Sequence, residues 1–372
     1  MTPEEIELLS ELTIIIPTYN RPLELERAIE YWRDTPMTVH ILDGSDLAFF
    51  NEGLQAGTHG IYYHSFPQKN ETVTENWGRR QLFASGLMTT RFAALCCDDD
   101  VFTFSGLVKA LKLLNDGVAD SVAGKTGEYS VQRGKVNWTH KYPHWKNEDF
   151  QQSSKLCERL LFDGGAHAYY AVYKSDKLVN IHKIGNLFSF PVPVWHSMLV
   201  EVLIRIFARV KFLDEIFWLK CDVNYPEARP IKFAPIFWDE KYSEYKNMFI
   251  EGLNKGIQIV EPGMSTDDRN ELISNFYSKF KKPKKLKKFE VNLKAKVLTV
   301  TSKLPKSVRT FIYKSLSNNL KKRIGNSNFE VNYKPVVLLT GLDLVNDSLK
   351  NWERILLMPR KELRLRANTY NG

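Results

Sequence analysis

The sequence predicts an α/β protein with a parallel sheet in its N-terminal part and a mostly helical, basic C-terminal extension. Two observations predict the sheet: short apolar runs rich in β-branched residues alternate with helical patterns, and polar residues follow several of these runs. A third observation, the crowding of lysines after residue 279, predicts the extension.

The first expected strand covers residues 12–16, a continuous apolar run that stops at Pro17 as a buried parallel strand meets a loop. A helix should begin at Pro22, because proline suits the first helical turn, and end before residues 34–36. The same reasoning predicts strands at residues 38–42, 60–63, 91–97 and 212–219, and helices at residues 75–89, 194–210, 240–256, 266–280, 291–303 and 307–324. The β-α-β-α-β order implies parallel strands joined by right-handed crossovers.

With 372 residues the chain exceeds one typical domain. We expect a sheet domain at residues 1–230, a helical connecting region at 231–280 and the basic extension at 281–372. The sequence leaves open whether the apolar run at residues 349–357 packs back on the body.

Four cysteines without a CxxC pair suggest neither a disulfide framework nor a zinc site, which favours a reducing, cytoplasmic setting. The first residues are acidic where a signal peptide would be basic. Charged residues interrupt the most apolar stretch, residues 192–219, so no segment is expected to cross a membrane.

The run Asp98, Asp99 and Asp100 is the most informative feature of the sequence. Three adjacent carboxylates after a buried strand repel one another and resist desolvation, so a hard divalent cation is a suitable partner. Asp43 follows another expected strand, and ligands of open α/β sheets bind beyond the carboxyl ends of the strands. A solvated acidic turn or a helix N-cap is the simpler alternative for the run.

Together, the opening motif at residues 13–21, Asp43 at the end of the second strand, and the acidic run Asp98 to Asp100 resemble the inverting family 2 glycosyltransferases of the GT-A fold. The resemblance covers about residues 10–220 and is strongest before residue 105. It implies a Rossmann-like domain that binds a nucleotide-diphosphate sugar, with UDP as the expected nucleotide and a glycan or lipid-linked molecule as the acceptor.

The resemblance also implies roles for individual residues. The loop after the first strand would line the nucleotide site through Pro17, Thr18, Tyr19, Asn20 and Arg21. Asp43 would contact the base, Asp98 the ribose, and Asp100 an Mg²⁺ or Mn²⁺ ion on the diphosphate. Asp99 also counts among the expected residues of the nucleotide site. The alternation of strand residues, however, suggests that its side chain points away from those of Asp98 and Asp100.

Two departures from the family pattern concern the phosphates and the base. The usual Ala-Arg-Asn-x-Gly element corresponds to residues 74–78, with Arg79 and Arg80 beyond it, and these arginines and Lys69 remain candidate phosphate neighbours. The usual Glu-Asp pair is not evident, so the base candidates are His196, placed near a helix start, and Glu201, favoured by its carboxylate.

Other candidates remain open. His167, which follows a Gly pair, could contact an acceptor or simply face water. Aromatic side chains could stack on sugars or fill the core, and they are Tyr129, Trp138, Tyr142, Trp145, Tyr169 and Tyr170.

Residues 279–323 contain sixteen lysines and arginines and the single acid Glu290, a charge of +15 within a chain whose total is +9. Apolar residues at partly helical spacing favour an anionic membrane surface as its partner, at the inner face of the membrane. A solvated tail is the alternative, and nucleic acid is disfavoured because no reader fold accompanies the charge.

The leading hypothesis is therefore a metal-dependent glycosyltransferase. A non-catalytic nucleotide-sugar-binding or scaffold protein on a degenerate GT-A fold is the alternative, because the base is not placed. A nucleotidyltransferase fits less well, because the Gly-rich phosphate loop and lysine expected near residue 20 are missing.

Overall fold

The computed structural model describes residues 1–49, 57–68, 71–132, 135–141, 153–161, 168–190, 193–221, 237–278, 347–359 and 362–363. Residues 1–280 and 337–372 form one compact unit and residues 281–336 a second. All of the described residues belong to the first unit.

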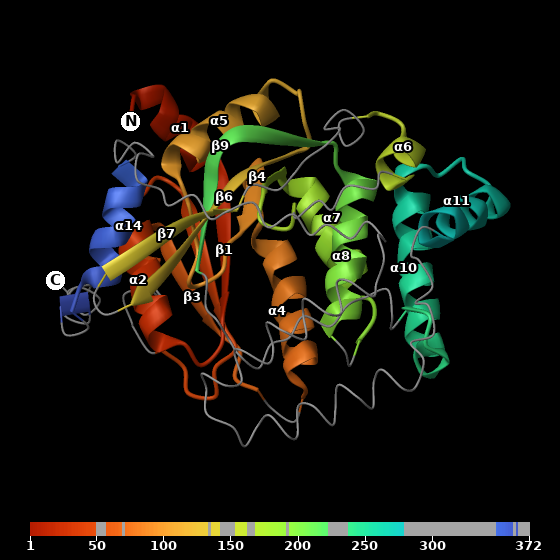
Figure 1. Cartoon of the computed structure of the whole chain (residues 1–372), viewed down its shortest axis with the longest axis horizontal. Coiled ribbons are helices and arrows are strands. Elements are labelled where there is room, and N and C mark those ends of the chain that lie inside the picture. Colours follow the sequence, from red (N-terminus) through yellow and green to blue (C-terminus); the bar gives the residue numbers. More distant parts are fainter. Residues whose placement is uncertain are drawn as a thin grey trace, which may run out of the picture. The chain divides into compact units, whose positions relative to one another are not determined.

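A single mixed sheet of nine strands organises the first unit, in the order β3-β2-β1-β4-β8-β6-β9-β5 with β7 paired to β6 (Figure 1). The strands are β1 Leu12–Thr18, β2 Thr38–Asp43, β3 Ile61–Ser65, β4 Phe92–Leu95, β5 Val101–Phe102, β6 Ser121–Gln132, β7 Lys135–Lys141, β8 Val172–Lys174 and β9 Val210–Cys221. Strands β1 to β4 are mutually parallel, as the alternating sequence pattern predicts, and β6 and β9 are also parallel.

The helices are α1 Pro3–Ser10, α2 Pro22–Trp32, α4 Val73–Leu87, α5 Phe104–Asn115, α6 Leu156–Leu161, α7 Ser175–Gly185, α8 Pro193–Phe207, α10 Ser243–Val260, α11 Thr266–Ser278 and α14 Asp347–Leu357, with 3₁₀ turns at Thr58–Gly60 and Glu240–Tyr242. The predicted helices at residues 291–303 and 307–324 lie outside the described residues.

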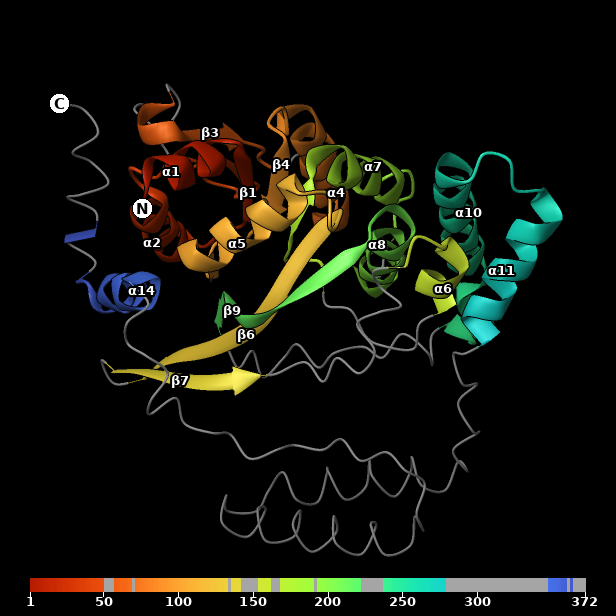
Figure 2. The ribbon, with the colours of Figure 1, turned by 90° about the horizontal axis from the view of Figure 1, so that it is seen from above.

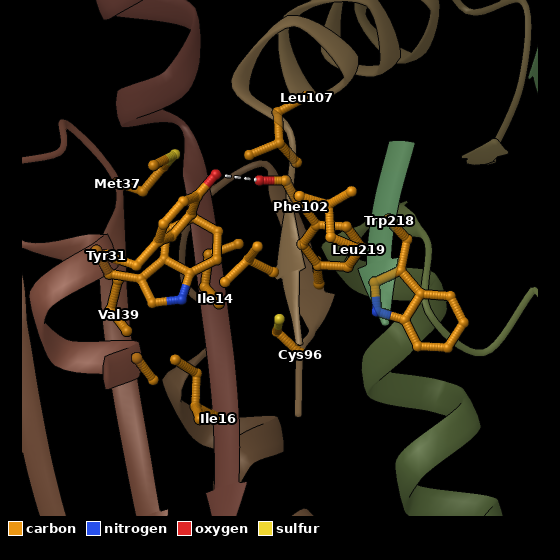
Figure 3. Close-up of a cluster of buried hydrophobic side chains, with 14 of the residues drawn as sticks. Ile14, Ile16, Tyr31, Met37, Val39, Cys96, Phe102, Leu107, Trp218 and Leu219 are labelled. Carbon is orange, nitrogen blue, oxygen red and sulfur yellow. Dashed lines mark hydrogen bonds between the residues drawn. The ribbon is translucent and has the colours of Figure 1, made fainter. Parts of the chain in front are cut away.

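The two faces of the sheet bury separate cores. Along β1, Ile14 and Ile16 belong to one core and Ile15 to the other, because successive strand residues face opposite sides. The first core includes side chains of α1, α2, α5 and α14, and the second those of α4, α6, α7, α8, α10 and α11. Figure 2 shows α1, α2 and α5 apart from α7, α8, α10 and α11. Figure 3 shows Ile14 near Tyr31, and Ile16 farther along the same strand, in the first core.

Strand β1 runs two residues farther than predicted and includes Pro17. The carbonyl of Ile15 accepts from the Cys96 amide, so backbone groups of odd-numbered residues point toward β4, which has ended at Leu95. The missing N–H of Pro17 therefore interrupts no ladder, and proline is tolerated there.

The hairpin β6–β7 was not predicted. Its strands pair in antiparallel register from Thr126 and Lys141 to Gln132 and Lys135. Gly124, Gly127 and several polar residues interrupt the apolar pattern of β6, so the period of two that marks a strand is weak there.

The C-terminal helix α14 packs against α2 and β7, so residues 349–357 do return to the body. The domain boundaries at residues 230 and 280 stay a prediction. Among the described residues, no helix combines the length and the apolar character that a bilayer span requires.

Candidate functional site

The carboxyl ends of β1, β2 and β4 bring the predicted site residues together. Thr18 is in register with Asp43 across the parallel pair β1–β2. The Thr18 hydroxyl donates to Asp98 Oδ2 at 2.7 Å, which joins the end of β1 to the acidic run beyond β4. Adjacent parallel strands thus place at one sheet edge residues that lie up to 80 positions apart.

Arg21 neutralises two carboxylates of the acidic run. Its Nη1 lies 2.7 Å from Asp98 Oδ1 and its Nη2 2.7 Å from Asp99 Oδ2. Asp99 therefore does not point away from Asp98, contrary to the expectation from strand alternation. The run follows β4 as a turn rather than as a strand, so alternation does not apply to it.

The loop that carries Arg21 is fixed by the loop after β2. Asn20 adopts a left-handed φ of 54°, which asparagine tolerates, and its amide N–H donates to Ser45 Oγ at 2.7 Å. Its side chain also pairs with Asp46. Tyr19 reaches in another direction, and its hydroxyl donates to Gln68.

Burial dominates the electrostatics of the acidic run. It raises the pKa of Asp98 to about 7, although Arg21 and Thr18 act in the opposite direction. Burial and the neighbouring Asp99 raise the pKa of Asp100 well above its usual range, although the Cys221 amide donates to Asp100 Oδ1 at 2.9 Å. Two such carboxylates ionise together only when positive charge is close.

The donor set fits a hard divalent cation. Within the described part of the chain, Cys97, Asp99 and Asp100 offer ligand atoms that lie within 4.8 Å of one another. The two carboxylates suit Mg²⁺ or Mn²⁺. Cys97 suits them less, because burial raises the pKa of its thiol, which also bonds the Tyr170 hydroxyl at 2.9 Å. Asp99 and Asp100 are therefore the residues that could hold the ion.

Asp43 is buried and closes the loop after β2. Its Oδ1 accepts from the Ser45 amide at 2.8 Å, and its Oδ2 accepts from the Phe49 amide at 3.2 Å and from the Tyr63 hydroxyl at 2.5 Å. A nucleotide base that contacts Asp43 directly would therefore have to share these oxygens with the three groups that donate to them. The predicted role of Asp43 in base recognition stays a prediction.

Arg80 lies beneath the loops, whereas Arg79 turns outward. The buried Nη1 of Arg80 donates to the carbonyls of Thr18 at 2.8 Å and Leu42 at 3.0 Å, which ties the end of β1 to β2. Arg79 pairs with Glu71 at 2.5 Å and is half exposed. The sequence did not distinguish these neighbours, because their helical positions show only once α4 is docked. Lys69 lies outside the described residues.

The two base candidates occupy different environments on α8. His196 is buried against α7, where a Cβ on Gly185 would lie 3.8 Å from its Nε2, and burial lowers its pKa to about 4. Burial raises the pKa of Glu201 to about 8, with Arg205 opposing. Burial raises the pKa of Tyr169 and of Tyr173, and the charge of Glu201 adds to both shifts.

Two adjacent tyrosines link the acidic run to the side of α8 that carries Glu201. Tyr170 bonds Cys97, and its ring meets that of Tyr169 edge-to-face at 5.2 Å. The Tyr169 hydroxyl accepts from Gln81 of α4. His167, Tyr142 and Trp145 lie outside the described residues.

Sequence reasoning did not find three residues that shape this site: Cys221, Trp218 and Tyr129 as a partner of the acidic run. The ring of Trp218 stacks on Tyr170 at 4.3 Å, and the Tyr129 hydroxyl donates to the Asp99 carbonyl. No local signal could have found them, because each comes from β6 or β9, far along the chain. Trp138 packs on Tyr129 at 5.6 Å rather than at the acidic run.

The sequence matches no protein-family model and no curated protein. Solved structures similar to the chain include S. aureus TarS 1–349 and its complexes with UDP-GlcNAc and with UDP, each at 14% identity. The free form has a TM-score of 0.47 and covers 75% of this chain and 76% of its own. The UDP-GlcNAc complex has a TM-score of 0.47 over 75% and 77%, and the UDP complex 0.44 over 72% and 72%. A likeness this distant carries no argument about ligand or activity.

Proposed function

We propose that the chain is a metal-dependent glycosyltransferase of the GT-A type. It would move a sugar from a nucleotide-diphosphate donor, with UDP-sugar favoured, to a glycan or lipid-linked acceptor with inversion. The observation that carries the proposal is the convergence of Thr18, Arg21 and the acidic run at the carboxyl ends of three parallel strands. The family resemblance of the same motifs supports it.

The residues of the acidic run would divide the donor between them. Asp98, held by Thr18 and Arg21, would face the ribose, and Asp99 and Asp100 would hold the cation. Bound there, a divalent ion neutralises the negative charge that develops on the diphosphate leaving group. Arg21 offsets part of the negative charge of Asp98 and Asp99 at the same place, which lessens their repulsion of the diphosphate.

Transfer also needs a base for the acceptor hydroxyl. The hydroxyl oxygen forms the new bond to the anomeric carbon, its proton passes to the base, and the bond to the diphosphate breaks with its electron pair on the nucleotide. Glu201 is the better candidate, because a carboxyl with a pKa of about 8 retains affinity for a proton near neutral pH. His196, with a pKa of about 4, is a weak proton acceptor.

The decisive experiment compares Asp100→Asn and Asp98→Asn with the wild type. Both variants should lose Mn²⁺-dependent binding of UDP, measured by thermal stabilisation, and sugar transfer from a panel of UDP-sugars. Asp176→Asn is a matched control, because its side chain is 64% exposed on α7. Full activity of Asp100→Asn in the presence of chelator would overturn the proposal.

The buried position of His196 and the engaged oxygens of Asp43 favour one second candidate, a non-catalytic nucleotide-sugar-binding or scaffold protein. That function predicts UDP binding without turnover on any acceptor, and no effect of Glu201→Gln.

We also propose that residues 279–323 bring the enzyme to an anionic membrane surface. The segment lies outside the described residues, and the support is its charge of +15 with interspersed apolar residues. Helix α11 directly precedes residues 279–346, and helix α14 directly follows them. The basic segment is thus tethered at both ends to the unit that carries the acidic run.

A further inference from the structure

Helix α14 places a tryptophan between two tyrosines of the first core. The Trp352 ring lies 5.4 Å from that of Tyr31 at 84° and 6.0 Å from that of Tyr129 at 82°. All three side chains are almost fully buried. Edge-to-face contacts of this kind restrict the rings that take part in them.

Both tyrosines donate hydrogen bonds to the backbone that forms and follows the acidic run. The Tyr129 hydroxyl donates to the carbonyl of Asp99. The Tyr31 hydroxyl donates to the carbonyl of Phe102 at 2.7 Å, as Figure 3 shows. Since Asp100 lies between these two carbonyls, the backbone on both sides of a candidate metal ligand is held by rings that contact Trp352.

A third contact leads from α14 to the same segment. The Ser348 hydroxyl oxygen accepts from the Phe104 amide at 3.0 Å, at the start of α5. The Phe104 ring in turn stacks on Tyr31 with 5.4 Å between centroids. Helix α14 therefore contacts the backbone just after the acidic run directly as well as through the tyrosines.

The helix is anchored well enough to act as a support. Its buried face recurs at helical spacing and consists of Ser348, Leu349, Trp352, Ile355 and Leu356. From α2, Arg27 donates to the Leu356 carbonyl at 3.1 Å, and Glu30 lies 3.7 Å from Arg354.

We propose that α14 is a positioning element of the acidic run and that Trp352 is its central positioning residue. The carboxylates of the run repel one another and are desolvated, so their geometry depends on the backbone being held from outside. A metal site must keep its ligands within about 0.5 Å of the productive arrangement. Residues about 250 positions away in sequence would thus set how well Asp99 and Asp100 bind a cation. The predicted effect on cation binding rests on the proposed function, whereas the positioning of the backbone of the acidic run does not.

Hydrogen exchange of the full-length protein tests the positioning directly. Trp352→Ala should increase amide exchange in a peptide covering residues 96–104 by at least about tenfold, because the lost contacts free both tyrosine rings. Trp352→Phe should restore protection, since the indole N–H has no hydrogen-bond partner among the described residues and the phenyl ring keeps the packing. Phe276→Ala on α11 is the control, a buried aromatic truncated in the other core.

Tyr129→Phe serves as a second variant if Trp352→Ala does not fold. It keeps the ring against Trp352 and removes the hydroxyl that donates to the Asp99 carbonyl and also bonds the Cys221 side chain. Titration of the proteins with Mn²⁺ alone, followed by electron paramagnetic resonance, should show affinity about tenfold weaker for Tyr129→Phe and Trp352→Ala, and unchanged for Phe276→Ala.

The outcomes distinguish the metal-dependent function from the positioning role of α14. If the wild type binds no Mn²⁺ while Trp352→Ala loosens residues 96–104, the metal-dependent function fails and the positioning role stands. If a folded Trp352→Ala, or Tyr129→Phe in its place, keeps wild-type exchange in that peptide, the positioning role is wrong. Equal loosening by Phe276→Ala would also overturn it, since the effect would then be one of general stability.

Discussion

At the scale of single residues, Arg21 shows how the chain accommodates crowded carboxylates. One guanidinium reaches two neighbouring acids, a geometry that arginine offers and lysine does not. Even so, burial outweighs this pairing at Asp98, whose pKa is raised to about 7. The negative charge of the ionised site is therefore only partly compensated, and a cation or a cationic ligand can compensate the rest.

Replacing Arg21 tests this balance. Arg21→Ala should lower the free energy of unfolding by about 1 to 2 kcal/mol in urea titrations, a limited cost because Asp98 can take up a proton instead. Added Mn²⁺ should raise the melting temperature more in the variant than in the wild type. Arg21→Lys, which cannot bridge both acids, should have an unfolding free energy between those of the wild type and Arg21→Ala. An unchanged unfolding free energy would show that the pairing contributes nothing.

The two base candidates predict different pH profiles. With Glu201 as the base, kcat/KM should rise about tenfold per pH unit up to about pH 8 and then level off, because only the ionised carboxylate accepts a proton. With His196 as the base, the imidazole is fully deprotonated above about pH 5, so the profile should be flat from pH 6 to 9. Glu201→Gln, assayed beside the wild type, identifies the group responsible for any rise.

Gly44 shows a residue required by close approach. A Cβ there would lie 2.6 Å from Asn76 Oδ1 and 2.8 Å from Arg80 Cζ, so any side chain would push the buried guanidinium off the ends of β1 and β2. Gly44→Ala should cost about 1 to 3 kcal/mol of unfolding free energy. Gly86→Ala, where nothing lies within 4 Å of the new Cβ, is the matched control and should not destabilise the protein. Equal stability of the two variants would contradict the packing argument.

At the scale of elements, Asp120 joins the strands of the mixed half of the sheet. It precedes β6 and bonds Arg209, just before β9, and Lys174 at the end of β8. Burial raises its pKa, but the bonds and charge of Arg209 together with Lys174 prevail and lower it to about 2.

This shift predicts a pH-dependent contribution to stability. A carboxyl whose pKa falls on folding stabilises the native state above its unfolded pKa of about 4 and loses that contribution as the pH falls toward 2. Asp120→Asn should therefore be less stable than the wild type by about 2 kcal/mol at pH 7, and the difference should shrink below pH 4. Urea titrations at several pH values measure it, and a constant difference would contradict the linkage.

At the scale of the whole molecule, the chain returns to its starting domain after a long basic segment. Helix α14 brings Trp352 into the core that also contains Ile14 and Tyr31. Any partner that engages residues 279–346 is therefore tethered, through α11 and α14, to the unit that holds the acidic run.

The proposed membrane association is tested with the full chain and vesicles. Binding to vesicles that contain phosphatidylserine should be strong at low salt and weaken as ionic strength rises, since each cation near anionic headgroups contributes about 1 kcal/mol. Replacing the six lysines between residues 281 and 288 by glutamine should reduce binding strongly. Equal binding to neutral vesicles would contradict an electrostatic attachment.

The sequence by itself determined the parallel half of the sheet, the helices α2 and α4 between its strands, and the acidic run at its edge. These features are local: hydrophobic periodicity, Pro22 at a helix start, and polar residues where apolar runs end. Tertiary structure alone decided which side chains support the run. Arg80 rather than Arg79 faces the strand ends, and the run is a turn, so that Asp99 joins Asp98. Tyr129 reaches the run from β6, and Trp352 of α14 contacts the Tyr129 ring. Such contacts depend on how helices dock and strands pair, and neither leaves a periodic signal in the sequence.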